Sequence, residues 1–589
     1  MSIRLHSVWL LASLALLRFG VAASQDTPPG DAGFQRLADE FIDGFYLPEN
    51  PTAATQLGVH RYDARLDAYD RAAIDRQTRQ LHAWERRLAA VETSGLSERL
   101  AGDRDILLSN VRSTLLTLET IRPWEKNPDT YPSGVADSVF VIMERDYAPA
   151  AQRLQSVIAR ERQIPQALLQ ARRNLRNPPE IFTRIAIEQL PGTIDLFEHD
   201  LPAAFASVAD RALQSQFRRS NAAVITALRR YLEWLNADVL PRSHGDFRLG
   251  AETFSAKLRY DEMVDTPLDE LLQIGTADLK RNQQAFALVA QELEPDRSAR
   301  EVLVELDHDH PPPQELLASF RATFDGLLAF IHEHHIITIP DGPAPDLEPT
   351  PPFERATSFA SMDTPEPFET HATAAYFNVT LPEPGWDAQR VEGYMEQFNY
   401  PLISNVAVHE AYPGHYVQFL WERHQQDRVR LLMGAESNIE GWAHYCEQMM
   451  LDEGFGQAGP GADADQRRRA LWLRLGQLQD ALLRDARFVV GIRMHTGSMS
   501  YEQAIDFFHD EGYQSRENGE TESKRGASDP TYLYYTLGKL QIMKLRADLA
   551  AREGPDFNLQ RFHDDFMRQE FAPLKLVRRA LLHDDSPTL

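Results

Sequence analysis

The stretch "VAVHEAYPGHYVQ", residues 406–418, combines two histidines with residues that interrupt helices. His409 is followed at once by Glu410, as in metal-binding helices in which a second histidine comes four residues after the first. Here the fourth position is Pro413, and the next histidine is His415, six residues on. Side chains six residues apart on a regular helix point about 120° away from each other. The two histidines can therefore share a metal ion only if the helix is broken between them.

The pair Pro413-Gly414 predicts such a break. Pro413 removes a backbone donor and clashes with the preceding turn, and Gly414 tolerates unusual backbone dihedrals. We expect the pair to act as a two-residue insertion that swings His415 back towards His409. The spacing then fits a metal site.

A third ligand is needed, because zinc in hydrolases has three protein ligands and one open position. The segment "AESNIEGWAHYCEQMM", residues 435–450, places Glu440, His444 and Glu447 along one helical face. We favour Glu440 as the ligand and Glu447 as a partner of the histidines, with His444 as a competing ligand. Cys446 is interpreted as a small buried side chain.

The alternative needs no metal. In that interpretation His409 and Glu410 are neighbours by chance, and Glu440 is an ordinary surface carboxylate. The residues alone favour the metal site and leave this alternative open.

The composition is that of a globular protein. The chain has 589 residues, 43% hydrophobic and 25% charged, and its length favours two or more lobes. Its net charge of -26 repels phosphate backbones, so we do not expect nucleic acid as a partner. Because Cys446 is the single cysteine, an internal disulfide is excluded and a lipid anchor on an N-terminal cysteine is not expected.

The first residues are typical of a secretory signal. Arg4 and His6 precede an apolar run over residues 8–17, and small residues follow at 21–23. This pattern predicts a signal peptide over residues 1–23 and a periplasmic or secreted protein. The alternative is an ordinary N-terminal helix. Since no later stretch reaches the ~18 apolar residues of a spanning helix, we expect no stable membrane span after signal removal.

Most of the chain is predicted to be helical. We expect an N-terminal helical region over 24–340 and a metal-site helical region over 371–589, which together form one bilobal unit. The proline-rich segment 341–370 is interpreted as an ordered crossing between lobes or a loop at the edge of a cleft. Just after it, Tyr376 and Phe377 favour a strand.

Several motifs together resemble a known family. "HEAYPGH" at 409–415 and "EGWAHYCE" at 440–447 resemble the bacterial family called domain of unknown function 885. "GAETFSAKLRY" at 250–260, "RMHTGSMSYEQAIDFF" at 493–508 and "YYTLGKLQIMKLR" at 534–546 follow in family order. The resemblance covers nearly the whole mature chain.

The resemblance carries implications for fold and chemistry. The family is usually exported and is grouped with the zincin-like metallopeptidases. This implies a mostly α fold, large and bilobal, with a deep cleft and a short β element beside the metal site, as in angiotensin-converting enzyme and the oligopeptidases. The segment "AAYFNVTLP", residues 374–382, could then bind substrate by main-chain pairing.

These observations predict a zinc-dependent hydrolase, with peptide-bond cleavage as the favoured activity. His409, His415 and Glu440 would bind Zn²⁺. Glu410 would take a proton from the attacking water and pass it to the leaving amine. The substrate would be a peptide or a small amide.

The developing oxyanion also needs a donor. The candidates are His495, Tyr535 and Arg525, of which Tyr535 matches the family's usual tyrosine and Arg525 could instead grip a substrate carboxylate. Each of the three could equally be structural.

Two other functions fit the same residues. One is an exported protein that binds peptides or other ligands on a peptidase fold without turnover. The other is an amidohydrolase that acts on a non-peptide amide or ester, because the activation of water is the same.

Overall fold

The structure of the protein is a computed structural model that describes residues 30–350, 360–383, 385–459 and 461–589. The predicted signal peptide, residues 1–23, lies outside the described residues. Helices make up most of the described chain, and the described strands form one three-stranded sheet. The prediction of a mostly α fold is confirmed.

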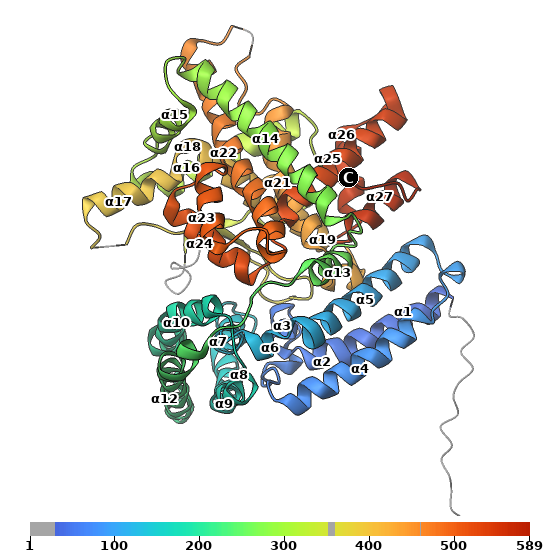
Figure 1. Ribbon diagram of the computed structural model, residues 1–589, viewed down its shortest axis with the longest axis vertical. Coiled ribbons are helices and arrows are strands. Elements are labelled where there is room, and N and C mark those ends of the chain that lie inside the picture. Colours follow the sequence, from blue (N-terminus) through green and yellow to red (C-terminus); the bar gives the residue numbers. More distant parts are fainter. Residues whose placement is uncertain (1–29, 351–359, 384, 460) are drawn as a thin grey trace, which may run out of the picture.

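The helices up to residue 234 form the lower part of Figure 1. They are α1 (Asp31–Phe41), α2 (Leu47–Glu49), α3 (Pro51–Gln56), α4 (Arg71–Ala89), α5 (Glu98–Leu116), α6 (Pro123–Lys126), α7 (Thr130–Met143), α8 (Ala150–Glu161), α9 (Ile164–Asn174), α10 (Glu180–Asp195), α11 (Leu201–Ala204) and α12 (Arg211–Trp234). Helices α7 to α12 are held by a core of their own that contains Val139, Phe197 and Leu228.

The remaining helices form the upper part of the molecule (Figure 1). They are α13 (Ala251–Asp261), α14 (Leu268–Leu293), α15 (Ala299–Asp307), α16 (Leu316–Glu333), α17 (Ala388–Met395), α18 (Tyr400–Glu410), α19 (His415–Glu422), α20 (Arg428–Leu432), α21 (Glu436–Asp452), α22 (Ala464–His495), α23 (Tyr501–Asp510), α24 (Arg516–Ser528), α25 (Tyr534–Glu553), α26 (Leu559–Met567) and α27 (Leu574–Leu582). Helix α14 lies along α22, so residues 268–293 pack with the C-terminal helices, whereas α13 packs mainly on α5.

One large core joins the beginning and the end of the chain. It contains Phe41 of α1, Leu107 of α5, Trp442 of α21 and Val577 of α27, all buried. Burial of such large apolar side chains is the main favourable term in folding. The first helices therefore hold in place the helices that carry the motifs quoted above.

The sheet lies next to α18. Its strands are β1 (Asp346–Pro349), β2 (Ala360–Asp363) and β3 (Tyr376–Val379), in the order β1-β3-β2. Strand β3 pairs in parallel with β1 and in antiparallel fashion with β2, and β2 packs against α18. The predicted strand at Tyr376 is confirmed. The proline-rich segment 341–370 contains two strands that were not predicted.

The position of β3 corrects one expectation. Because β3 is the central strand, both of its edges are already paired over residues 376–379. It cannot add a substrate strand by main-chain pairing there, since that mode needs an exposed edge. Its Phe377 is fully buried and contacts Phe320 and Phe324 of α16. The residues of "AAYFNVTLP" that form β3 therefore anchor the sheet.

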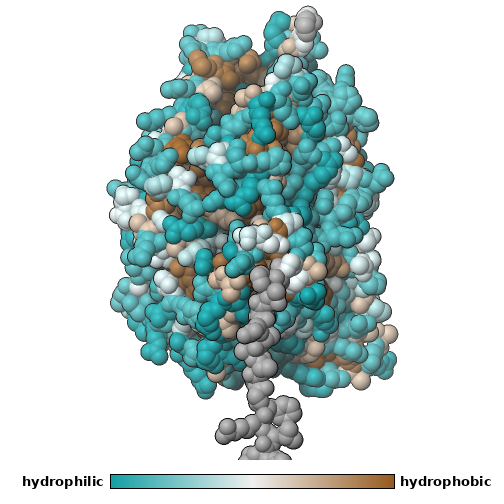
Figure 2. Space-filling model, turned by 90° about the vertical axis from the view of Figure 1, so that its right-hand side faces the viewer, coloured by the Kyte–Doolittle hydropathy of each residue, from teal (hydrophilic) through white to brown (hydrophobic). Residues whose placement is uncertain are grey.

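One face of the molecule has few large apolar areas. On the face shown in Figure 2, hydrophobic residues form small areas within a mainly hydrophilic surface. None of the described helices combines the length and the hydropathy that a membrane span requires.

Candidate metal centre

The helix that carries the first histidine ends where the sequence predicts. Helix α18 ends at Glu410 and α19 begins at His415. Between them the N–H of Gly414 donates to the carbonyl oxygen of Val408 over 3.0 Å. A Cβ on Gly414 would lie 1.8 Å from the carbonyl oxygen of His409, so a side chain cannot be accommodated at this turn. The break is confirmed, and the glycine is needed for space.

Helix α21 contacts the turn between α18 and α19. Trp442, which is fully buried, donates its indole N–H to the carbonyl oxygen of Pro413 over 2.9 Å. Gln418 of α19 donates to Asn438 of α21 over 2.9 Å. The turn and the second histidine are thus fixed to the helix that carries the predicted third ligand.

The three predicted metal ligands lie together. The Oε2 atom of Glu440 is 3.4 Å from Nε2 of His409 and 3.4 Å from Nε2 of His415. One ligand atom from each residue lies within 4.8 Å of the others. Both histidines are buried, whereas Glu440 is partly exposed, with 21% of its side-chain surface accessible. The structure therefore brings together side chains from three different helices.

The spacings from Glu440 to the two histidines are compatible with a zinc ion. Ligand atoms held about 2.0–2.1 Å from zinc in a tetrahedron are about 3.3–3.4 Å apart. The two distances to Glu440 Oε2 have this value. The same oxygen is inaccessible to solvent and makes no hydrogen bond to the described residues, although buried acceptors are normally satisfied. A cation between the three side chains would satisfy it.

Glu447 orients the first histidine. Its Oε1 atom is 2.7 Å from Nδ1 of His409, and its Oε2 atom is 3.1 Å from Nδ1 of His444. Arg484 of α22 approaches the same carboxylate at 3.4 Å. A carboxylate on the far nitrogen of a metal-binding histidine is a common second partner, because it fixes the ring. Glu447 thus contacts His409, as its place on the helical face predicts.

His444 contacts the other oxygen of Glu447 and is not part of the cluster. It is fully buried, and burial lowers its pKa to about 4. Among the described residues that could hold a metal ion, the grouped side chains are His409, His415 and Glu440. The structure thus groups Glu440, and not His444, with the two histidines.

The electrostatics of the cluster favour a positive charge. Burial disfavours the charged form of His409, yet the carboxylate of Glu440 at 3.4 Å and the hydrogen bond to Glu447 raise its pKa to about 10. Against the effect of burial, His409 and His415 hold the pKa of Glu440 well below its usual range. Arg484 and His444 do the same for the pKa of Glu447. The two carboxylates therefore stay ionised at neutral pH and attract a cation.

The carboxylate of Glu410 is unpaired among the described residues. It is the last residue of α18, directly after His409, and it is half-buried. No hydrogen bond or ion pair engages its carboxylate within the part of the chain that the structure describes.

Tyr535 and Arg525 lie beside the cluster. The ring of Tyr535 stacks against His409 with 6.4 Å between the ring centroids. Arg525 donates to the phenol oxygen of Tyr535 over 3.3 Å. The guanidinium groups of Arg484 and Arg487 also lie over the Tyr535 ring, at 5.7 Å and 5.2 Å. Burial and the charge of Glu440 raise the pKa of Tyr535, so its phenol remains a proton donor.

His495 is held by other groups. It is 1% exposed, and its Nε2 donates to the carbonyl oxygen of Gly526 over 2.7 Å. Its ring packs against Phe247 and Phe254. Burial lowers its pKa to about 4. Within the described chain it forms no hydrogen bond, ion pair or ring contact with the three proposed ligands.

The sequence did not point to Arg484 and Arg487. Both occur in the long helix α22, and neither stands in a recognisable motif. In the structure Arg487 makes two hydrogen bonds of 2.7 Å to Glu522, and Arg484 binds Glu447. No local signal could have found them, because their partners come from other helices.

The comparisons with known proteins agree with this fold. A family described as "Bacterial protein of unknown function (DUF885)" matches residues 51–581. A solved structure from Shewanella oneidensis, provisionally described as a lipoprotein of unknown function, has a TM-score of 0.79 and 26% identity, and covers 93% of this chain and 100% of its own. A second, from Colwellia psychrerythraea and also provisionally described as a lipoprotein, has a TM-score of 0.77 and 17% identity, and covers 93% of this chain and 98% of its own. No curated protein matches the chain. The chain belongs to the DUF885 family of bacterial proteins of unknown function.

Proposed function

We propose that the protein is a zinc-dependent hydrolase that cleaves peptide bonds with an activated water molecule. His409, His415 and Glu440 would hold the ion. When bound, zinc supplies the Lewis acidity that makes a water molecule nucleophilic near neutral pH. The observation that carries the proposal is the pair of 3.4 Å distances from Glu440 Oε2 to the two histidines.

Glu410 would act as the general base. It follows a proposed ligand directly, and no described side chain neutralises it. It would take a proton from the attacking water and donate it to the leaving amine, which is the role of a carboxylate beside a hydrolytic centre. Glu410 handles protons in this scheme and does not hold the ion.

Tyr535 would stabilise the oxyanion. Its phenol is protonated and lies beside His409, and Arg525 donates to its oxygen. A donor that is already in place when charge develops contributes a large share of catalysis in acyl transfer. Arg525 would position the phenol and add positive charge. His495 would support the end of α22 by its bond to Gly526.

Substrate would enter along the sheet and the helix ends, in the deep cleft that the family resemblance implies. Because β3 is the central strand, a peptide could pair by its main chain only with an edge strand of the sheet. Strand β2 is such an edge and packs against α18, which carries His409 and Glu410. We therefore assign β2 as the substrate-pairing strand.

We further propose that the protein is exported to the periplasm or secreted. The support is the signal-like run in residues 1–23. N-terminal sequencing of protein from the native host should find a mature start near Ser24. An intact Met1 or Ser2 in a cytosolic fraction would contradict export.

The function is tested by elemental analysis together with digestion of a peptide library, and of simple amides and esters. Stoichiometric zinc with peptide cleavage is the expected result. Zinc with cleavage of amides or esters alone would identify an amidohydrolase. Full zinc without any hydrolysis would favour a ligand-binding protein.

A further inference from the structure

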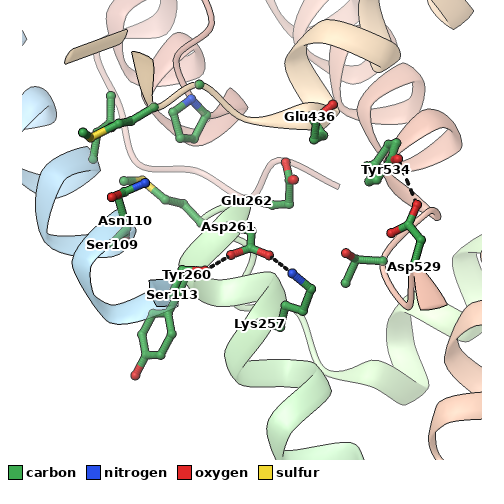
Figure 3. Close-up of a pocket in the computed structure, with 16 residues that line it drawn as sticks. Ser109, Asn110, Ser113, Lys257, Tyr260, Asp261, Glu262, Glu436, Asp529 and Tyr534 are labelled. Carbon is green, nitrogen blue, oxygen red and sulfur yellow. Dashed lines mark hydrogen bonds and ion pairs between the residues drawn. The ribbon is translucent and has the colours of Figure 1, made fainter. Parts of the chain in front are cut away.

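A cavity of about 460 Å³ opens between the two parts of the molecule (Figure 3). Its walls come from α5, from α13 and the residues just after it, from the start of α21, and from the turn before α25. A volume of this size is within the range of small-ligand sites. The cavity can therefore hold a side chain or a small group.

Most of the ionisable groups in the cavity are acidic, and two of them lack a cationic partner. Asp261 is neutralised by Lys257, whose Nζ lies 2.5 Å from its carboxylate. Asp529 accepts from the phenol of Tyr534 over 3.2 Å (Figure 3), and its carboxylate lies 3.9 Å from Nε of Arg525. Glu262 and Glu436 remain, and no lysine or arginine of the described chain forms an ion pair with either. The cavity thus holds acidic groups in excess of its cations.

Glu262 is the buried member of this pair. It is 3% exposed, and the backbone N–H of Ser437 donates to one of its oxygens over 3.0 Å. The residue lines the cavity, and burial raises its pKa to about 6. A carboxylate buried to this extent is normally paired with a cation.

Glu436 is the accessible member. It is the first residue of α21 and is exposed, and no hydrogen bond or ion pair holds its carboxylate within the described residues. Desolvation and the neighbouring carboxylates, Glu262 first among them, raise its pKa to about 7. Figure 3 places Glu436 and Glu262 at the same side of the cavity. A ligand that brings a positive charge would reach both and favour their ionised forms.

Part of the remaining wall suits an aliphatic chain. Ile106, Met263, Met433 and Pro573 line the cavity beside the carboxylates. Lysine and arginine side chains pack their methylene groups on apolar surface and direct the charged end to acceptors. A free N-terminal amine would use the carboxylates but would leave the apolar wall without a partner.

The cavity adjoins the proposed metal centre. Glu436 precedes Glu440 by one helical turn, which is about 6 Å along the helix axis. Tyr534, which lines the cavity, precedes Tyr535. We propose that this cavity binds the lysine or arginine side chain of a peptide substrate, next to the bond that is cleaved. This inference rests on the proposed hydrolase function.

Paired peptides test the proposal. N-acetylated peptides that differ only in lysine or norleucine at one position would be compared by kcat/KM, with the position scanned across the peptide. We expect the lysine peptide to be preferred about 100-fold at one position, because two charge-assisted bonds contribute about tenfold or more each. Glu436→Gln and Glu262→Gln should each reduce this ratio about tenfold. The amide oxygen introduced by Glu262→Gln would still accept from Ser437, so helix α21 keeps this contact.

Glu233→Gln is the matched control. Glu233 is exposed on α12 and does not line the cavity, so the lysine preference should be unchanged. Glu436→Lys should reverse the preference towards a glutamate peptide. Equal kcat/KM for lysine and norleucine at every position, or a preference that survives Glu436→Lys, would overturn the assignment. So would a preference for a free N-terminal amine in unacetylated peptides.

Direct binding separates this inference from the proposed function. The same peptides would be titrated calorimetrically into the zinc-loaded Glu410→Gln protein. This measurement of binding does not depend on turnover. Tighter binding of the lysine peptide that is lost in the Glu410→Gln, Glu436→Gln double variant supports the cavity even if no hydrolysis is found. Equal binding of both peptides contradicts it even if the enzyme is active.

Discussion

Gly441 of α21 and Gly538 of α25 are in contact where the two helices cross. A Cβ on Gly538 would lie 2.7 Å from Cα of Gly441 and 1.9 Å from the carbonyl oxygen of Ser437. Glu440 precedes one glycine by one residue, and Tyr535 precedes the other by three. The close crossing therefore sets the distance between the proposed ligand and the proposed oxyanion donor.

Gly538→Ala tests this crossing. The added methyl group meets backbone atoms that cannot move aside, so we expect a loss of about 1–3 kcal/mol in the free energy of unfolding. Zinc occupancy should also fall, because Glu440 shifts away from the histidines. Chemical denaturation and elemental analysis measure the two effects.

Gly326→Ala is the control for helix propensity. Gly326 lies in α16, and nothing lies within 4 Å of a Cβ built there. Alanine at an exposed helical position should stabilise by about 0.5–1 kcal/mol. Equal effects of the two substitutions would show that the crossing does not depend on glycine.

The third ligand gives a second prediction. Glu440→Gln should strongly reduce zinc content, because a neutral amide is a poorer ligand than a carboxylate. Glu436→Gln should leave zinc bound, since that residue lies one turn away. If both variants retain zinc equally well, Glu440 is not the ligand, and His444→Ala becomes the variant to examine.

Glu447 gives a third prediction. Its bond to His409 holds the ring in place, so Glu447→Gln should weaken zinc affinity about 10–100-fold, as is typical for such partners of a ligand. Competition with a fluorescent chelator measures the affinity, and Glu233→Gln on the exposed face of α12 serves as the control. An affinity unchanged from wild type would show that His409 is oriented by its own helix.

His495 gives a fourth prediction, which concerns pH. Burial holds its folded-state pKa at about 4, below the ordinary value of about 6.5. Between pH 4 and pH 6.5 the histidine binds a proton in the unfolded chain but stays neutral in the folded protein. The stability that neutral His495 contributes is therefore present above pH 6.5 and is lost as the pH falls towards 4. The difference in unfolding free energy between wild type and His495→Gln, measured by chemical denaturation, should therefore shrink over this window. A difference that stays constant from pH 7 to pH 4 would contradict the buried neutral state.

Activity distinguishes the two roles of His495. If it is structural, zinc-loaded His495→Gln should hydrolyse peptide within a few-fold of the wild-type rate at neutral pH. A loss of about 100-fold or more with unchanged zinc content and stability would instead make it the oxyanion donor.

The sequence predicted the arrangement around His409 better than the sheet. The break between His409 and His415 follows from Pro413-Gly414, whose effect on a helix is local. The face that carries Glu440 and Glu447 follows from helical spacing. Both depend on neighbours in the chain, so one sequence was sufficient.

Strands β1 and β2 could not be predicted in the same way. Strand β1 has the sequence "DLEP" and β2 has "ASMD", and neither shows the alternating apolar residues of a strand signal. They form because β3 offers both of its edges. The contacts of Arg484 were missed for the same reason, since Glu447 comes from another helix.

The most direct test of the central claim is zinc content beside the peptide hydrolysis rate for wild type, Glu410→Gln and His409→Ala. We expect Glu410→Gln to keep its fold and its zinc while turnover falls by at least about 10²–10⁴-fold, the usual loss when general acid–base catalysis is removed. His409→Ala should lose zinc and activity together. A Glu410→Gln protein that hydrolyses peptide at the wild-type rate would contradict the mechanism, even with the metal site intact.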